Sequence, residues 1–75
     1  MKFPNKELIE SLRKRYPTGA RVVLDHMEDV QAPPIGSKGT VRWVDDIGSI
    51  MVDWDEGGSL SVVYGEDLCH VVKEG

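Results

Sequence analysis

After Gly19 the sequence alternates apolar and polar residues over five short runs, and this period of two is typical of β-strands. The runs are ARVVL (20–24), GTVRWV (39–44), SIMVDW (49–54), SLSVVY (59–64) and CHVV (69–72), all rich in β-branched or aromatic residues. Residues 25–38 are too long and too rich in proline for a tight hairpin, so they predict one long loop. Short strands joined by tight turns predict a mainly β fold, a small five-stranded, partly open barrel over residues 20–72.

Before Gly19 the pattern is helical. Four apolar residues fall on one helical face, namely Leu8, Ile9, Leu12 and Tyr16. Acidic residues come early in this segment and basic residues late, which complements the helix dipole, and Pro17 ends it. The sequence therefore predicts one amphipathic helix over residues 5–16 laid over the barrel, and a single domain over residues 1–75. A membrane-surface role is disfavoured because the polar face is not strongly basic.

Charge is unevenly distributed along the chain. The net charge is −4, with 13 acidic and 9 basic residues, but residues 1–21 carry six basic residues, Lys2 among them, against two acidic ones. The amino end is thus basic and the body acidic, and the net negative charge of the whole chain weakly repels nucleic acid and anionic lipid. Cys69 is the only cysteine, so no internal disulfide forms, and no apolar run reaches the ~18 residues of a membrane helix. We expect a soluble cytoplasmic protein that does not engage a membrane.

The turn at residues 45–48 sets the register of the first hairpin. An even-length turn there pairs Trp43 with Ile50, Val41 with Val52 and Arg42 with Met51. An odd-length turn would set Arg42 against Ile50. We therefore predict the even turn, which puts the large apolar residues on one face.

An odd-length turn is predicted for the next hairpin. With Gly57 or Gly58 in the left-handed conformation, it pairs Trp54 with Leu60, Val52 with Val62 and Ile50 with Tyr64. Trp54 is then a core residue. Trp43 is expected on the same face of the sheet as Trp54 but lies near a strand end. Either a buried Trp43 or a partly exposed Trp43 in a binding groove therefore fits the pattern.

Five carboxylates surround Trp54 in the segment 44–59, and we expect them to be structural. They are Asp45, Asp46, Asp53, Asp55 and Glu56. Asp favours tight turns by hydrogen-bonding its own backbone, so the four at turn positions are predicted to be mostly exposed. A calcium loop of the EF-hand type starting at Asp53 would place Tyr64 at its twelfth position, where a bidentate Glu is required. No metal is therefore predicted.

The remaining candidate chemistry is also weak. One cysteine with His26 and His70 at no recognised zinc spacing predicts no zinc site. Cys69 and His70 are neighbours on a strand, so their side chains point to opposite faces. A pairing of Cys69 with His26 is geometrically conceivable, but a structural thiol is the commoner case. The segment GSKGT (36–40) lacks the order of a phosphate loop. We predict no catalytic residues, no cofactor and no enzyme.

A family resemblance rests on the elements YPTGARV (16–22), PPIGSKGTV (33–41), VDDIGSIMVDWD (44–55) and GED (65–67). Residues 16–72 resemble a family of small bacterial and phage domains known as domain of unknown function 4314. The order GTV…V…D…WD is also similar to small Src-homology-3-like barrels. The resemblance implies the barrel and a bacterial or phage setting, and it carries over no catalytic residue.

A stripe on the outer face of the hairpins is the candidate partner-binding site. The predicted registers gather Arg42, Met51 and Val63 there, with Val44 and Trp43 nearby. Docking of the helix on this stripe or over an open barrel end would hide both apolar surfaces at once, and if the helix docks elsewhere the stripe binds a partner or a second copy. We predict a non-catalytic protein- or peptide-binding module. The alternative is a nucleic-acid accessory that uses the basic helix, which the acidic body disfavours.

Overall fold

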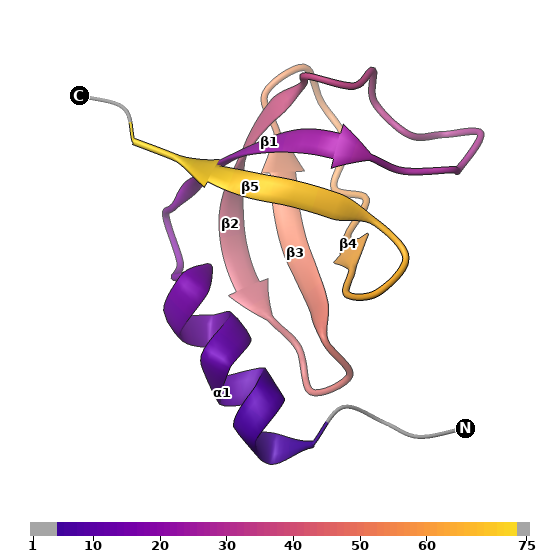
Figure 1. Ribbon diagram of the computed structural model, residues 1–75. Coiled ribbons are helices and arrows are strands. Elements are labelled where there is room, and N and C mark those ends of the chain that lie inside the picture. Colours follow the sequence, from indigo (N-terminus) through magenta and orange to yellow (C-terminus); the bar gives the residue numbers. More distant parts are fainter. Residues whose placement is uncertain (1–4, 74–75) are drawn as a thin grey trace.

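The computed structural model describes residues 5–73, which form one helix and five strands (Figure 1). The elements are α1 (Lys6–Arg15), β1 (Arg21–His26), β2 (Lys38–Val44), β3 (Ser49–Trp54), β4 (Val62–Val63) and β5 (Leu68–Val72). All strand pairs are antiparallel and form one sheet in the order β4-β3-β2-β1-β5. The predicted mainly β fold with one N-terminal helix is confirmed, and the sheet is not closed. Lys2 lies outside the described residues.

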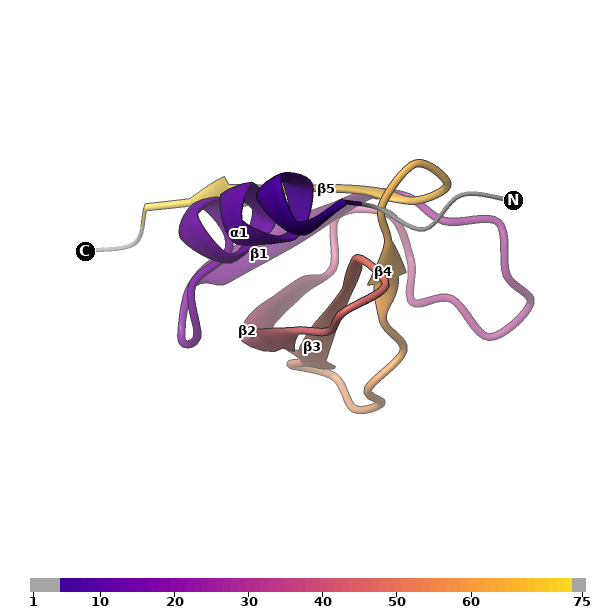
Figure 2. The ribbon, with the colours of Figure 1, turned by 90° about the horizontal axis from the view of Figure 1, so that it is seen from below.

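The sheet bends so strongly that the β1–β5 pair crosses the β2–β3 pair (Figures 1 and 2). Gly39 lies at the crossing, where β2 pairs with Val22 on one side and with Trp54 on the other. A Cβ atom on Gly39 would lie 2.5 Å from Val52 Cγ1 and 2.8 Å from the Asp53 carbonyl oxygen. Only glycine fits this close approach, so residue 39 is a packing requirement and not merely part of a turn.

The core lies between the two crossing layers. Its buried residues are Ile9, Leu12, Val22, Leu24, Val41, Val44, Ile50, Val52, Trp54 and Val62. Ile9 and Leu12 belong to α1 and place the helix over the end of the folded sheet near the β2–β3 turn. The view from below shows α1 against this end (Figure 2). Of the two predicted docking positions, α1 therefore takes the open end, but the expectation that this docking would also hide the outer stripe is wrong, because Trp43 stays exposed there.

Local contacts fix the ends and the position of α1. The Asn5 side chain accepts a hydrogen bond of 2.8 Å from the Leu8 N–H and caps the first turn. Arg13 donates from Nε to the Val44 carbonyl (3.1 Å) and from Nη2 to Asp46 Oδ1 (2.9 Å). These two bonds join α1 to the end of β2 and to the turn that follows it.

A β-bulge near the end of β2 changes the predicted register of the first hairpin. Val41 lies opposite Val52 as predicted, but beyond the bulge Trp43 lies opposite Met51 and Val44 opposite Ile50. The prediction of Trp43 opposite Ile50 and Arg42 opposite Met51 is therefore wrong. Because a shift of one residue reverses the faces of a strand, Val44 enters the core, and its predicted place on the outer face is wrong too.

The segment between α1 and β1 holds the bulge. The Thr18 hydroxyl donates a 2.8 Å hydrogen bond to the Arg42 carbonyl, and the Gly19 N–H donates to the Val41 carbonyl at 2.7 Å. The carbonyl at the bulge thus keeps a partner although the ladder is interrupted there. These contacts join residues far apart in the sequence, so counting residues on either side of the hairpin turn does not predict them.

The second hairpin differs from the prediction by two residues. Ile50 lies opposite Val62 instead of Tyr64, and the predicted strand 59–64 shortens to Val62–Val63. Gly57 and Gly58 both adopt positive φ, and the Trp54 N–H donates to the Gly58 carbonyl at 3.1 Å, so the turn closes two residues earlier than predicted. Because side chains alternate between the two faces of a strand, a register shift of two residues leaves each side chain on its predicted face. Trp54 is therefore buried as predicted, and its indole N–H donates to the Leu60 carbonyl at 2.8 Å.

Candidate functional site

Four of the five candidate residues lie together on the outer face of the β2–β3–β4 sheet. We call Arg42, Trp43, Met51 and Val63 the Trp43 patch. The Trp43 side chain is 58% exposed and lies opposite the half-buried Met51. Val63 is also half-buried and lies opposite Ser49, diagonal to Met51. The bulge therefore puts the large indole in solvent beside two apolar neighbours, which settles the alternatives for Trp43 in favour of exposure.

Charged groups border the Trp43 patch on two sides. Arg42 Nε lies 3.6 Å from Asp53 Oδ2, and both side chains are more than half exposed. On the other side, Arg13 and Asp46 form their ion pair at the helix end. Exposed pairs of this kind contribute about 0–1 kcal/mol to stability, so Arg42 can exchange its partner at little cost, whereas Arg13 is also held by the Val44 carbonyl.

A hollow of about 270 Å³ adjoins Trp43. It is lined by Arg13, Tyr16, Thr18, Trp43 and Val44. The indole forms one wall and the end of α1 forms another. The hollow extends the Trp43 patch towards the helix, a feature that depends on helix docking and that the sequence alone did not reveal.

The carboxylates act mainly through turns and ion pairs. Asp45 Oδ1 accepts hydrogen bonds from the Ile47 N–H (3.0 Å) and the Ser49 N–H (2.8 Å), so Asp45 closes the β2–β3 turn. Asp45 is half-buried, whereas the sequence predicted exposure, because both of these amides draw it inward. Asp46, Asp55 and Glu56 are exposed as predicted. Over residues 5–73, no group of three or more His, Cys, Asp or Glu side chains is arranged to hold a metal ion.

Asp55 forms an ion pair that spans three strands. Both Asp55 carboxylate oxygens accept hydrogen bonds from the Arg21 guanidinium, one of them at 2.7 Å, and Arg21 also donates to Thr40 Oγ1 at 2.9 Å. Hydrogen bonding from Arg21 lowers the pKa of Asp55 below its usual 3.8. The contact joins β1 to β2 and to the end of β3 on the outer surface.

The lowered pKa of Asp55 predicts a pH dependence of stability. A carboxyl group whose pKa is lower in the folded state stabilises the fold above its unfolded pKa, and this contribution is lost as the pH falls through the folded value. We expect Asp55→Asn to lower the urea midpoint at pH 7 and to match the wild type more closely at about pH 3. The control is Glu56→Gln, which removes a neighbouring exposed carboxylate and should change neither midpoint. A gap between wild type and Asp55→Asn that is equally large at both pH values would contradict this assignment.

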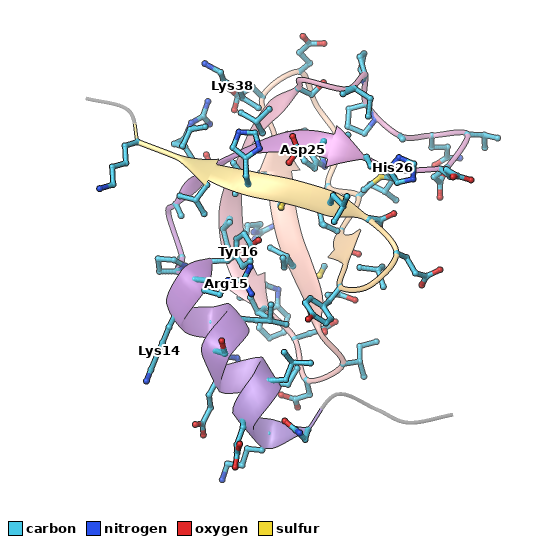
Figure 3. The ribbon with its side chains drawn as sticks, viewed as in Figure 1. Lys14, Arg15, Tyr16, Asp25, His26 and Lys38 are labelled. Atoms are coloured by element: carbon cyan, nitrogen blue, oxygen red, sulfur yellow. The ribbon has the colours of Figure 1, made fainter. Side chains whose placement is uncertain are left out.

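Cys69 is not placed for nucleophilic chemistry. It is half-buried opposite Leu24, and burial raises the pKa of the thiol to about 11, so it stays protonated at neutral pH. His70 turns to the other face of β5, where its Nδ1 lies 2.7 Å from Asp25 Oδ2. His26 pairs with Glu28 at 3.3 Å. Figure 3 labels Asp25 and His26 on β1.

Fold and surface together define a small β protein with a helix over one end of an open sheet. The chain belongs to the family described as domain of unknown function (DUF4314), which it matches over residues 5–72. The match spans α1 and all five strands. No curated protein and no solved structure matches the chain. The resemblance to Src-homology-3-like barrels stays a prediction. In the described part of the chain, no helix is both long enough and apolar enough to cross a membrane.

Proposed function

We propose that this protein is a small non-catalytic binding module that holds a partner protein through the Trp43 patch. The observation that carries the proposal is the bulge in β2, which holds the indole of Trp43 58% exposed beside Met51. Tryptophan and arginine are the residues most enriched among those that dominate binding energy at protein interfaces. The flexible Met51 side chain adapts to the shape of an opposing surface.

The packing of the hairpin supports a role for this exposure. Without the bulge, Trp43 would share the inner face with Val41, and the hairpin would bury one more large side chain. The chain instead uses Thr18 to hold the bulge and buries the smaller Val44. Exposing an apolar side chain to water does not help the chain to fold. An apolar side chain that a bulge holds in solvent is therefore better explained by a binding site. The cytoplasmic, bacterial or phage setting expected from the sequence belongs to the same proposal.

Affinity capture with matched variants tests this proposal. We expect wild-type protein immobilised on beads to retain a partner from a lysate of the source cells, and Trp43→Ala to lose it. Ile35→Ala is the control, because Ile35 is 62% exposed in the long loop and lies outside the Trp43 patch. Truncating an interface residue that dominates binding costs about 2 kcal/mol or more, which is roughly thirtyfold in affinity. Equal retention by Trp43→Ala and Ile35→Ala would contradict the proposal.

The nucleic-acid alternative uses the basic end of α1. Arg13 already bonds Val44 and Asp46, whereas Lys14 points away from the sheet in Figure 3. Filter binding of single- and double-stranded DNA at two salt concentrations separates the classes, because binding through phosphate weakens steeply with salt. Salt-sensitive binding lost in Lys14→Glu and kept in Trp43→Ala would favour the alternative.

A further inference from the structure

The sheet is open between its two edge strands, β4 and β5, and a groove of about 310 Å³ occupies this opening. Its lining residues are Arg15, Tyr16, Ile50, Val62, Tyr64, Gly65, Asp67, Leu68 and Cys69. Core residues Ile50 and Val62 lie at its base. Leu68 and Tyr64 are 60% and 47% exposed at its rim. The volume is at the lower end of the range for ligand sites, enough to bury one or two side chains.

The hydrogen bonds of β1 reveal which backbone groups of β5 face this groove. The Leu24 N–H donates to the Ser37 carbonyl, and the Leu24 carbonyl accepts from the Gly36 N–H, so the backbone of Leu24 faces β2 and its loop. In an antiparallel pair, the residue opposite such a position also turns its N–H and C=O away from its partner strand. Cys69 lies opposite Leu24, and Val71 lies opposite Val22. Both therefore direct their backbone groups to the free edge.

One contact confirms this direction. The Tyr16 hydroxyl donates to the Cys69 carbonyl from the helix side at 3.4 Å, a long hydrogen bond. Figure 3 shows Tyr16 and Arg15 in the space between α1 and β5. In the part of the chain that the structure describes, neither the Cys69 N–H nor the Val71 N–H donates a backbone hydrogen bond outside the strand ladder. The edge of β5 thus presents backbone N–H donors beside an apolar groove, together with the Cys69 carbonyl, whose long hydrogen bond from Tyr16 an added strand would replace.

We propose that an extended segment of a partner protein adds to the free edge of β5 as a sixth strand and inserts an apolar side chain into the groove beside Leu68 and Tyr64. This second site goes beyond the proposed function of the Trp43 patch. The backbone identifies the occupant, because outward groups at alternate residues of β5 recur about every 7 Å, the repeat of another extended chain. Side chains of the added strand alternate between the groove and solvent.

The charged residues that line the groove indicate which side chains the added strand would carry. The Arg15 guanidinium lies 5.5 Å from the centre of the Tyr16 ring at one wall of the groove. Asp67 at another wall is engaged, since its Oδ2 accepts from the Val63 N–H at 2.9 Å. Asp67 keeps its negative charge, so an acidic side chain next to the inserted apolar residue would be attracted to the Arg15 wall and not to the Asp67 wall. The segment we infer carries apolar residues at alternate positions and an acidic residue beside one of them.

A displayed library of random peptides of about ten residues, selected on the full chain, tests this inference. We expect enriched peptides to share alternating apolar positions with an adjacent acidic residue. In the complex with a selected synthetic peptide, amide exchange should slow at Cys69 and Val71. Methylating the peptide nitrogens one at a time should weaken binding about tenfold at alternate positions and less than about twofold between them, because every second N–H bonds β5.

Matched variants separate this site from the Trp43 patch. Leu68→Lys should weaken the selected peptide at least about tenfold, because it replaces an apolar side chain at the rim of the groove with a charged one, whereas Ile35→Lys, at a similarly exposed residue, should not. Trp43→Ala should leave the affinity within about twofold of the wild type. The inference is overturned if no peptide is selected, if methylation shows no alternation, or if Leu68→Lys binds normally. A peptide lost with Trp43→Ala instead would overturn it while supporting the proposed function. Sedimentation of the protein alone that shows a dimer abolished by Leu68→Lys would overturn it in favour of a second copy.

Discussion

Trp54→Ala is expected to remove a large part of the free energy of unfolding of this domain. The Trp54 side chain is 4% exposed among core residues of both layers, and its indole N–H satisfies the Leu60 carbonyl. Truncating a buried tryptophan costs about 3–5 kcal/mol, and a domain of this length has a total stability of about 4–11 kcal/mol. Urea unfolding followed by far-ultraviolet circular dichroism measures the loss.

Trp43→Ala is the matched control for this change, because it removes the same side chain from a site that is 58% exposed. We expect it to cost about 1 kcal/mol or less. Trp54→Phe should fall between the two, since it keeps an aromatic ring but leaves the Leu60 carbonyl without its donor. Equal midpoints for the two alanine variants would contradict the inward orientation of Trp54.

Gly39→Ala is expected to have the second largest effect, a loss of about 3 kcal/mol. The added methyl group would meet Val52 Cγ1 at 2.5 Å, the Asp53 carbonyl at 2.8 Å and Trp54 Cε3 at 2.9 Å. Rotation of Val52 relieves only the first contact, and the other two require β2 and β3 to move apart. The measurement is again the urea midpoint.

Gly36→Ala is the control, because Gly36 has a φ of +93° and open space around its Cβ position. A left-handed residue other than glycine costs about 1–2 kcal/mol, so this variant measures backbone strain without a clash. We expect Gly39→Ala to be the less stable of the two. The opposite order would mean that the strands separate at little cost.

Local patterns predicted the elements and much of the core. Alternation placed Val52, Val62 and Trp54 on one face, and all three are buried, because neighbouring residues on a strand point to opposite sides whatever the strand pairs with. The helical spacing of Ile9 and Leu12 likewise predicted their burial on one face of α1. These predictions held although the second hairpin is displaced by two residues, since that displacement preserves the faces.

The candidate site was predicted less well. Residues Arg42, Trp43, Met51 and Val63 lie on the outer face, but Val44 does not, because the bulge moves it inward. The bulge is held by a hydrogen bond from the Thr18 hydroxyl to the Arg42 carbonyl. Counting residues across the hairpin turn does not predict such a contact with another segment. The groove between β4 and β5 was not predicted either. It lies between β5 and the two-residue strand β4, and the pairing within one hairpin does not predict how two edge strands lie relative to each other.

The sequence by itself determined the helix, the strands and the faces they bury, because side-chain periodicity is a property of each segment alone. The tertiary structure decided that the helix covers one end of the folded sheet, that Trp43 lies in solvent and that no strand pairs with the outer edge of β5. Each of these depends on contacts between segments distant in the chain, such as Arg13 with Val44 and Thr18 with Arg42. Such contacts choose between arrangements that satisfy the local pattern equally well, and the choice is made only when the layers pack.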